Sequence, residues 1–522
     1  MWVATHTLPT SPGHPFYQQL NRALDAHGFD EFVEAQCAPF YAATVGRPSL
    51  LPGRYFRLLL IGYFEGQDSE RGIAWRTADS LSLRAFLGLG LEEATPEHST
   101  ISRTRRRIDL ETHRAVFTWV LQVLAQADLV KGLTVGVDAT TLEANAALRS
   151  IVRRDSGESY QAFLTRLAVE SGIETPTRAD LARLDRKRPK KGRNTDWEHP
   201  HDPDARITKM KDGRTHLAHK AEHAVDMDTG AIVAVTVQGA DEGDTTTVCD
   251  TLVDAADELE AVAAVTDGVT GVIETVVMDK GYHSNHVLVG LTEAGFRTFV
   301  AEPARGRRCW RGQPEARAAV YANRRRIASV RGRALQRQRS LRLEQPNAHL
   351  YETGGMRRTH LRGHANITKR LLVHVAAFNL ALLMRHVGGV GTPRGLQGRA
   401  AHIAAVLVAC WTVLVARIRH WSATVRATST SISIAWRQAL RPVALPRTPL
   451  TTGCYTQMDG ATGNFVAYPP PGQGPPYWST NTYSPGASLR IYNSGAITIN
   501  TSNGSQLCTV SNMAWGTQWC PP

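Results

Sequence analysis

Two aspartates stand at the ends of short apolar runs that predict buried strands. Asp138 follows "LTVGV", and Asp279 follows "ETVVM". The end of a strand presents its side chain to a crevice at the edge of a sheet, and an aspartate is rarely a core residue unless it is paired or bound to metal. If the two strands are neighbours, the carboxylates converge within reach of one divalent ion. The alternative is that each aspartate caps a turn or a helix.

A pair of magnesium ions needs a third carboxylate, because each ion requires near-octahedral oxygen coordination and keeps several waters. Glu344 and Glu352 are the downstream candidates, on a helix that follows the sheet. Two Mg²⁺ ions, for which Mn²⁺ can substitute, would activate water and stabilise the leaving oxygen of an in-line displacement at phosphorus. The acids therefore predict metal-dependent phosphoryl transfer.

The segments around these acids predict a mixed α/β sheet flanked by helices over residues 131–385. Apolar runs rich in β-branched residues alternate with helical patterns in the order strand, strand, strand, helix, strand, helix, strand. Inserts at about 146–210 and 303–342 interrupt this order. The other expected elements are "THLAHKAEHAVDMD", "AIVAVTVQGA", "DTTTVCDTLVDAADELEAV", "FRTFVAEP" and a buried helix in "NITKRLLVHVAAFNLALLMRH".

Residues 14–130 predict an all-helical N-terminal domain, because apolar residues recur at steps of three and four. Within it, Ser99 or Thr100 is the expected N-cap of a cationic helix. Such a helix can lie on a phosphate backbone or enter a groove of DNA, and the alternative is a solvated basic face. The arginines concerned are Arg103, Arg105, Arg106 and Arg107.

The charge balance indicates a polyanionic partner. The 522 residues include 60 Lys and Arg against 47 Asp and Glu, a net charge of +13. Residues 305–342 hold 13 arginines, among them Arg324 and Arg325, and a single acidic residue, Glu315. Like charges this close repel unless an anion is near. Nucleic acid is the expected partner, while a membrane surface or a ribosome also fits a basic composition.

Cysteine usage and apolar runs predict a protein of a reducing cytoplasm. Seven cysteines lack any metal-ligand spacing, which argues against a zinc site or a disulfide framework in the main body. The N-terminal residues lack the pattern of a secretory signal. The apolar stretch 403–416 is too short for a membrane span and predicts a buried helix.

The last 68 residues, 455–522, differ in composition from the rest. They carry two charges, Asp459 and Arg490, and nine aromatic residues among Gly, Ser, Asn and Pro. This pattern predicts a β-rich tail typical of secreted proteins, with a Cys508–Cys520 pair. Residues 386–454 predict a helical region and linker.

The chain resembles the DDE transposases of bacterial insertion sequences, in the IS-five and IS-eleven-eighty-two group. The likeness runs from about residue 14 to 454 and consists of many separate short sequence motifs that occur in the same order as in the family. These include "HPFYQQLNRALD", "GRPSLLPGRYFRLLLIGYFEGQDSERGIAW", "TVGVDATTLEANAALRS", "DPDARITKMKDGRTHLAHKAEH", "VVMDKGYH", "VYANRRRI", "ETGGMRRTHLRG" and "GVGTPRGLQGR".

The resemblance implies an RNase H-like core with Asp138 as first acid, Asp279 as second and Glu344 as third. Gln345, Pro346 and Asn347 replace the family's Arg, Ser and Phe, so we expect Pro346 to disturb the helix that carries Glu344. Glu352 is the fallback third acid. Expected contacts to DNA or the scissile phosphate are Lys220, Lys280, Tyr282, His283, Arg357, Arg358 and Arg362.

The implied activity is transposition: hydrolysis at the element's terminal inverted repeats and transfer of the freed 3′ hydroxyl to target DNA. Holding two double-stranded ends together predicts a homodimer. The family commonly ends near a "TGC" like that at 452–454, so the tail resembles read-through into an interrupted host gene. Two alternatives stay open: a DNA-binding remnant without metal chemistry, and a secreted-type binding module formed by the tail.

Overall fold

The computed structural model divides the chain into two compact units, residues 1–414 and 415–522. In the second unit only the backbone of six short strands is described. The described residues are 13–42, 49–188, 192–210, 213–304, 306, 308–396 and those strands.

The first unit begins with helices, as predicted. The most apolar of them is α3, whose residues are buried on every side, because a helix that is hydrophobic all round must lie inside the core. The bounds are α1 (Pro15–Ala26), α2 (Phe29–Cys37), α3 (Pro52–Phe64), α4 (Glu70–Ala78), α5 (Leu81–Phe86), α6 (His98–Arg107) and α7 (Leu110–Gln126).

The predicted cap of the cationic helix is wrong. Helix α6 begins at His98, and its N-cap is Glu97, whose side chain makes no capping bond. The carbonyl of Glu97 already accepts from the amides of Thr100 and Ile101. Ser99 and Thr100 therefore lie inside the first turn.

A mixed sheet forms the centre of the unit, as predicted. Strand β5 pairs antiparallel with β1 on one side and with β6 and β4 on the other, while β1, β7 and β8 run parallel. The bounds are β1 (Thr134–Glu143), β4 (Arg206–Lys209), β5 (Thr215–Asp226), β6 (Ile232–Gly239), β7 (Thr275–Met278) and β8 (Arg297–Val300).

Strand β1 does not end at Asp138, which corrects the predicted boundary. It pairs with β5 from Val135 to Glu143, whereas its parallel pairing with β7 ends at Val137 and Met278. The long partner β5 keeps β1 extended past the point where β7 stops. Asp138 is thus the first residue of β1 beyond the parallel pair.

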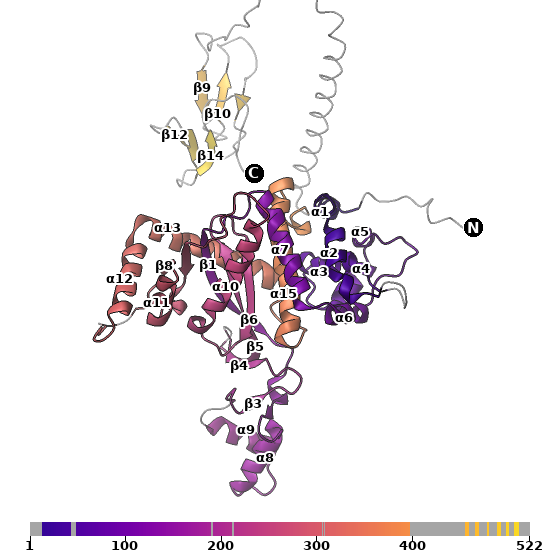
Figure 1. Cartoon of the computed structure of the whole chain (residues 1–522), viewed down its shortest axis with the longest axis vertical. Helices are drawn as coiled ribbons and strands as arrows, with labels where there is room; N and C mark the ends of the chain where they lie inside the picture. The colour runs from indigo at the N-terminus through magenta and orange to yellow at the C-terminus, as the bar shows by residue number, and fades with distance from the viewer. Residues whose placement is uncertain are drawn as a thin grey trace, which may run out of the picture. The chain divides into compact units, whose positions relative to one another are not determined.

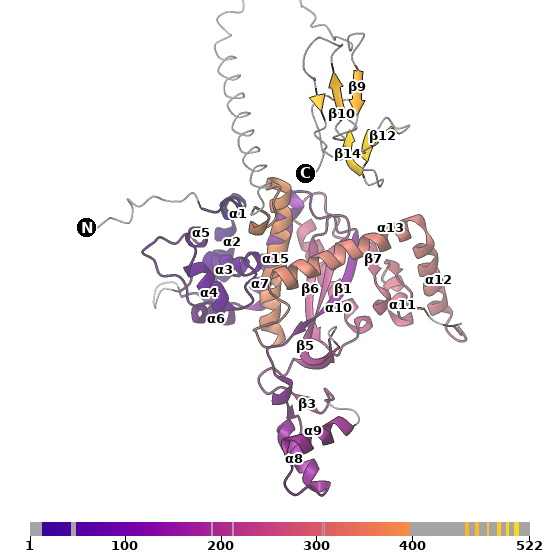
Figure 2. The same cartoon turned by 180° about the vertical axis from the view of Figure 1, so that it is seen from behind.

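Helices cover both faces of the sheet. Figure 1 shows α10 (Asp244–Ala263) in front of the sheet, where it packs on β5 and β6, and Figure 2 shows the helix that includes α13 crossing from the other side. The remaining helices of the core are α11 (Asn285–Glu293), α12 (Pro314–Ala328), α13 (Val330–Arg339) and α15 (His364–Gly388).

Helix α15 is a core helix of the unit. The helical segment 364–396 is long and apolar enough to cross a membrane, yet 72% of its most apolar window is buried inside the protein. It packs on α3, α7 and β6. The predicted helix at 403–416 and the linker to 454 lie outside the described residues.

The predicted insert at 146–210 is folded. It contains a two-stranded sheet and two helices around a small apolar cluster that includes Trp197. Figure 1 shows it extending away from the main sheet. Its elements are β2 (Val152–Arg153), α8 (Tyr160–Glu170), α9 (Arg178–Lys187) and β3 (Trp197–Glu198).

The second unit contains two antiparallel three-stranded sheets. Cys508 lies in the last strand, whereas Cys520 is outside the described residues, so their pairing stays a prediction. The strands are β9 (Tyr455–Met458), β10 (Phe465–Tyr468), β11 (Trp478–Ser479), β12 (Ser488–Ile491), β13 (Ile497–Asn500) and β14 (Gln506–Val510).

Two buried asparagines form hydrogen bonds with backbone groups of the edge strands of the main sheet. Asn323 of α12 accepts from the amide of Val300 at 3.0 Å and donates to its carbonyl at 2.8 Å. Asn379 of α15 makes the same pair of bonds with Ile232, at 2.9 and 2.8 Å. Each asparagine satisfies a donor and an acceptor that an edge would otherwise expose.

Replacing either asparagine by leucine should lower the free energy of unfolding by about 2 to 4 kcal/mol, because a buried amide and a carbonyl lose their partners together. Urea unfolding of Asn323→Leu and Asn379→Leu measures this. The control is Gln161→Leu on the exposed surface of α8, and an equal shift of the unfolding midpoint in the control would contradict the prediction.

Candidate active site

The pairing of β1 with β7 brings the first two predicted acids together. Val137 and Met278 are register partners, so Asp138 and Asp279 leave the parallel pair at the same end of the sheet. Both line a cleft with a cavity volume of about 510 Å³. The convergence expected from two neighbouring strands is therefore present.

Local hydrogen bonds hold the two aspartates. Asp279 Oδ1 accepts from the amide of Gly281 at 2.6 Å and caps the short helical turn η4 (Lys280–Tyr282). Asp138 Oδ2 accepts from Asn347 Nδ2 at 3.1 Å. The capping role proposed as the alternative for Asp279 is thus real, and it coexists with a position in the cleft.

The helix that carries Glu344 continues through Pro346. Residues on both sides keep right-handed helical angles, and the prolyl residue lies between two π-helical stretches. Proline removes a backbone donor and crowds the preceding turn, and π-type turns widen the helix at such points. The helix is therefore distorted around Pro346, as expected, but it is not broken. The segments are η5 (Ser340–Glu344), α14 (Gln345–Asn347) and η6 (Ala348–Thr353).

Glu344 and Glu352 both line the cleft, two turns apart on this helix. Glu352 forms an ion pair with Arg357, and its side chain is 61% exposed. Glu344 is exposed. Because Glu352 is engaged by an arginine, Glu344 is the better third acid.

Sequence reasoning missed Asp244, a further carboxylate of the cleft at the first position of α10. Lys220 Nζ lies 2.7 Å from its Oδ1. The signal available was weak, because an aspartate in the first turn of a helix is ordinary. Asn347 and Arg339, which also line the cleft, were missed too.

The donor set suits a hard cation. Its carboxylate oxygens are the ligands that Mg²⁺ and Mn²⁺ prefer, and no described lining residue is His or Cys. Within the described part of the chain, no three His, Cys, Asp or Glu side chains are already gathered tightly enough to hold one ion. The lining residues therefore fit such an ion by their chemistry.

Two family models match the chain. One is described as a Transposase domain (DUF772) and matches residues 7–107, and the other, a Transposase DDE domain, matches residues 194–380. No curated protein matches the chain. The chain belongs to the DDE transposases of bacterial insertion sequences. The transposase is therefore a metal-dependent enzyme that cleaves and transfers DNA, and its mixed sheet is the RNase H-like core.

The DDE match begins at residue 194 and so does not include Asp138. The place of Asp138 beside Asp279 in the transposase comes from the strand pairing alone.

Several residues predicted to contact DNA are buried in the transposase, which corrects their assignment. Lys220 is 4% exposed and bonded to Asp244 and Thr247, because it points from β5 toward α10. Tyr282 is 1% exposed, with its hydroxyl bonded to Glu222. His283 is equally buried. None of the three presents its polar end to solvent.

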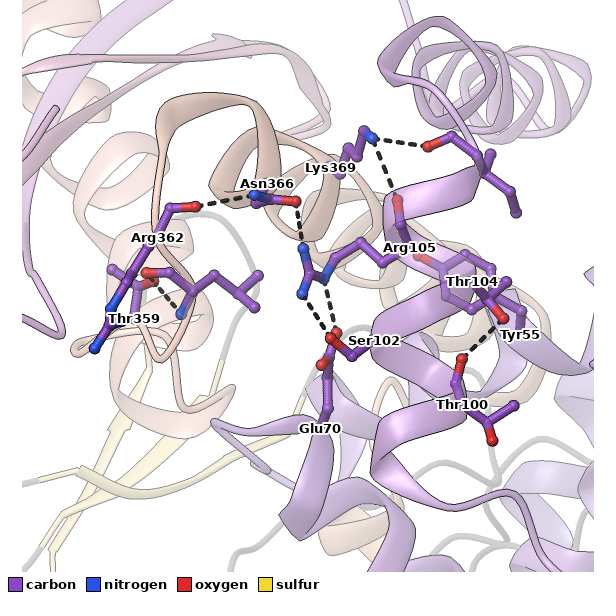
Figure 3. Close-up of polar contacts among 12 residues, drawn as sticks. Tyr55, Glu70, Thr100, Ser102, Thr104, Arg105, Thr359, Arg362, Asn366 and Lys369 are labelled. Carbon is purple, nitrogen blue, oxygen red and sulfur yellow. Dashed lines mark hydrogen bonds and ion pairs between the residues drawn. The ribbon is translucent and has the colours of Figure 1, made fainter. Parts of the chain in front are cut away.

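Arg105 is also internal. Its Nε lies 2.7 Å from Glu70 Oε1, its Nη2 donates to Ser102, and its Nη1 donates to Asn366 of α15 (Figure 3). Lys369 Nζ donates to the backbone carbonyls of Arg105 and Ile108 at 3.2 and 2.7 Å. Arg105 thus ties α6 to α4 and α15 instead of facing DNA.

Other predicted cations are accessible. Lys280, Arg103, Arg106 and Arg325 are exposed. Arg324 is 39% exposed and makes two bonds to Glu302, at 2.7 and 2.8 Å.

The loop after the helix of Glu344 carries three more of the predicted arginines, of which Arg357 lines the cleft. The amide of Glu143 donates to the carbonyl of Arg357, and that of Thr359 donates to the carbonyl of Glu143, so the loop pairs with the end of β1. Arg357 lines the cleft, and Arg358 and Arg362 are exposed beside it in sequence.

The Arg105→Ala transposase should lose about 3 kcal/mol of unfolding free energy, because Glu70 and Asn366 are left without their buried partner. Arg106→Ala, on the exposed side of the same helix, should change it by less than about 0.5 kcal/mol. Urea unfolding of the two variants compares them. Equal losses would show that Arg105 is not an internal tie.

Acid should destabilise the transposase through His223. Burial lowers the pKa of His223 from 6.5 to about 3. The unfolded chain therefore binds a proton below pH 6.5 that the folded protein excludes. Stability from this residue is complete above pH 6.5 and is lost as the pH falls toward 3, by about 2 kcal/mol at pH 5.

Urea midpoints at pH 7.5 and pH 5 measure this effect, and His223→Gln should reduce the difference between them. An unchanged difference would contradict the assignment. His113 also lowers the stability at acid pH, because burial lowers its pKa to about 4. This residue is present in both the parent and the His223→Gln variant, so its contribution does not affect the comparison.

Proposed function

We propose that the transposase cuts double-stranded DNA at the terminal inverted repeats of its element and joins the freed 3′ ends to target DNA, with Asp138, Asp279 and Glu344 as its catalytic acids. The observation that carries this proposal is that Asp138 of β1, Asp279 after β7 and Glu344 of η5 line one and the same cleft.

Asp138, Asp279 and Glu344 would hold two Mg²⁺ ions, which Mn²⁺ can replace. When bound, the ions supply Lewis acidity for activating water and for stabilising the leaving oxygen of the phosphodiester. The chain's own groups prepare the ligands. Asn347 orients one oxygen of Asp138, and the amide of Gly281 orients one oxygen of Asp279.

Cations at the rim would place the DNA strand. Lys280 follows Asp279 directly and is exposed, and Arg357 lines the cleft, so both lie where a phosphodiester must enter. Arg357 is released for phosphate when its bond to Glu352 opens. The other proposed DNA contacts are Arg103, Arg106, Arg324, Arg325, Arg358 and Arg362.

The proposed organisation assigns residues 14–130 to end binding and 131–385 to catalysis, with 386–454 as a helical linker. Two element ends must be held together for transfer, so the transposase acts on DNA as a homodimer in the cytoplasm, at the nucleoid. Residues 455–522 are a read-through tail with no part in catalysis.

The remnant interpretation rested on a break at Pro346. The continuous helix through Pro346 supports the active enzyme, because Glu344 keeps its place in the cleft. Replacing Gln345, Pro346 and Asn347 together by Arg, Ser and Phe tests the point: an active parent needs no such rescue, and only a remnant would gain cleavage.

Cleavage of a labelled duplex from the DNA that flanks the gene, with purified protein and Mg²⁺, tests the proposed chemistry. Asp138→Asn, Asp279→Asn and Glu344→Gln should each reduce the cleavage rate by more than about 100-fold, since each removes a direct ligand rather than a supporting bond. Binding to the ends should persist, because removing a negative charge does not weaken contact with phosphate.

Glu352→Gln is the matched control on the same helix and should cost less than about tenfold. If the Glu344 variant cuts normally and the Glu352 variant does not, Glu352 is the third acid. If neither the parent nor any variant cuts while all bind the ends, the proposed activity is wrong for this chain.

A further inference from the structure

Strand β5 carries two buried polar side chains beside the first acid. His223 is the register partner of Asp138, and Glu222 is the partner of Ala139. Both are almost fully buried. Successive residues of a strand point to opposite faces of the sheet. The side chains of Glu222 and His223 therefore face different layers of helices.

On one face, Glu222 holds the turn that carries the second acid. The hydroxyl of Tyr282 donates to Glu222 Oε1 at 2.9 Å, and Tyr282 stands three residues after Asp279. Thr247 and Thr251 of α10 also donate to Glu222, at 3.0 and 2.6 Å. Lys220 Nζ lies 3.5 Å away, so the buried carboxylate has a full set of partners.

On the other face, His223 holds the helix that carries the third acid. The hydroxyl of Tyr351 lies 2.7 Å from His223 Nε2, and Tyr351 stands seven residues after Glu344. Burial lowers the pKa of His223 and raises the pKa of Tyr351 well above its usual value. The ring is therefore neutral and accepts, and the phenol keeps its proton and donates.

These bonds link elements that the chain keeps far apart. Tyr282 is 60 residues from Glu222, and Tyr351 is 128 residues from His223. Strand β5 itself holds β1, and hence Asp138, through its backbone ladder. One strand thus contacts all three acid-bearing elements, by its ladder and by one tyrosine on each face.

We propose that Tyr282 and Tyr351 are positioning residues of this transposase. Their hydrogen bonds to Glu222 and His223 fix the positions of Asp279 and Glu344 relative to Asp138. They thereby raise the affinity of the site for the divalent ion. The inference rests on the proposed function of the three acids. It assigns a role to two residues that touch neither DNA nor metal.

The N-terminal domain offers a matched control. The hydroxyl of Tyr55 lies 3.0 Å from His113 Nε2, and both residues are buried there as well. Tyr55→Phe removes the same kind of bond at a position that does not hold any of the three proposed catalytic acids. A general loss of packing or stability would appear in this variant too.

Mn²⁺ binding to the full-length protein, followed by electron paramagnetic resonance of the free ion, tests the proposal without requiring turnover. Tyr282→Phe and Tyr351→Phe should each raise the Mn²⁺ concentration at half-saturation about tenfold, as the loss of supporting bonds does at metal sites. Tyr55→Phe should leave it unchanged. Binding of labelled element ends in EDTA should stay within about twofold of the parent in all three variants.

His223 provides a second measurement. His223→Gln keeps an acceptor and should bind Mn²⁺ more tightly than His223→Leu, which has none. Adding Tyr351→Phe to His223→Leu should cost little more, because the two residues share one bond.

Unchanged Mn²⁺ binding in both phenylalanine variants, or an equal shift in the Tyr55 control, would overturn the positioning role. Asp279→Asn separates this failure from a failure of the proposed function. If Asp279→Asn loses Mn²⁺ binding and the tyrosine variants keep it, only the positioning role is wrong. If Asp279→Asn binds Mn²⁺ as the parent does, the metal assignment itself is wrong.

Discussion

The parallel pairing of β1 with β7 is the constraint on which the active site depends. Two strands that run side by side in the same direction end at the same edge, so the residue that follows each meets its counterpart there. The antiparallel partner β5 then keeps β1 extended beyond Asp138. Asp138, the proposed first acid, therefore lies just beyond the parallel pair and lines the cleft.

Glu344, the proposed third acid, lines the same cleft from a helix that contains a proline. A continuous α-helix would leave the prolyl ring in contact with the preceding turn. Two π-helical stretches flank the short α-helical segment that contains Pro346. Glu344 ends the first stretch, Asn347 ends the α-helical segment, and both line the cleft. Irregular helix at a functional site is common, because the extra width redirects side chains without ending the helix.

The net charge of +13 is only partly available to DNA. Arg105 and Lys220 are buried and form ion pairs inside the protein. Each binds a buried or half-buried carboxylate and joins elements that are distant in sequence. A buried cation left without its partner is costly, so such pairs make the docking of α6 and α10 specific. The exposed arginines of α12 and of the loop after Thr353 remain for phosphate.

The sequence by itself determined most of the elements and indicated the candidate acids. Apolar periodicity was enough for the helical N-terminal region, the strands and α10, because burial on one face leaves a regular pattern. Asp138 and Asp279 were visible because an acid after an apolar run is unusual. The DDE motifs were specific enough to indicate the family, which the two transposase models confirm.

Only the tertiary structure decided how individual side chains are used. Whether an arginine faces solvent or a buried glutamate depends on a partner such as Glu70 or Asn366, which sequence distance does not reveal. The same holds for Asp244 in the cleft and for Tyr282 and Tyr351, which bond to side chains of β5. Their partners lie on other elements, and the contacts exist only once the sheet and its two layers of helices have packed.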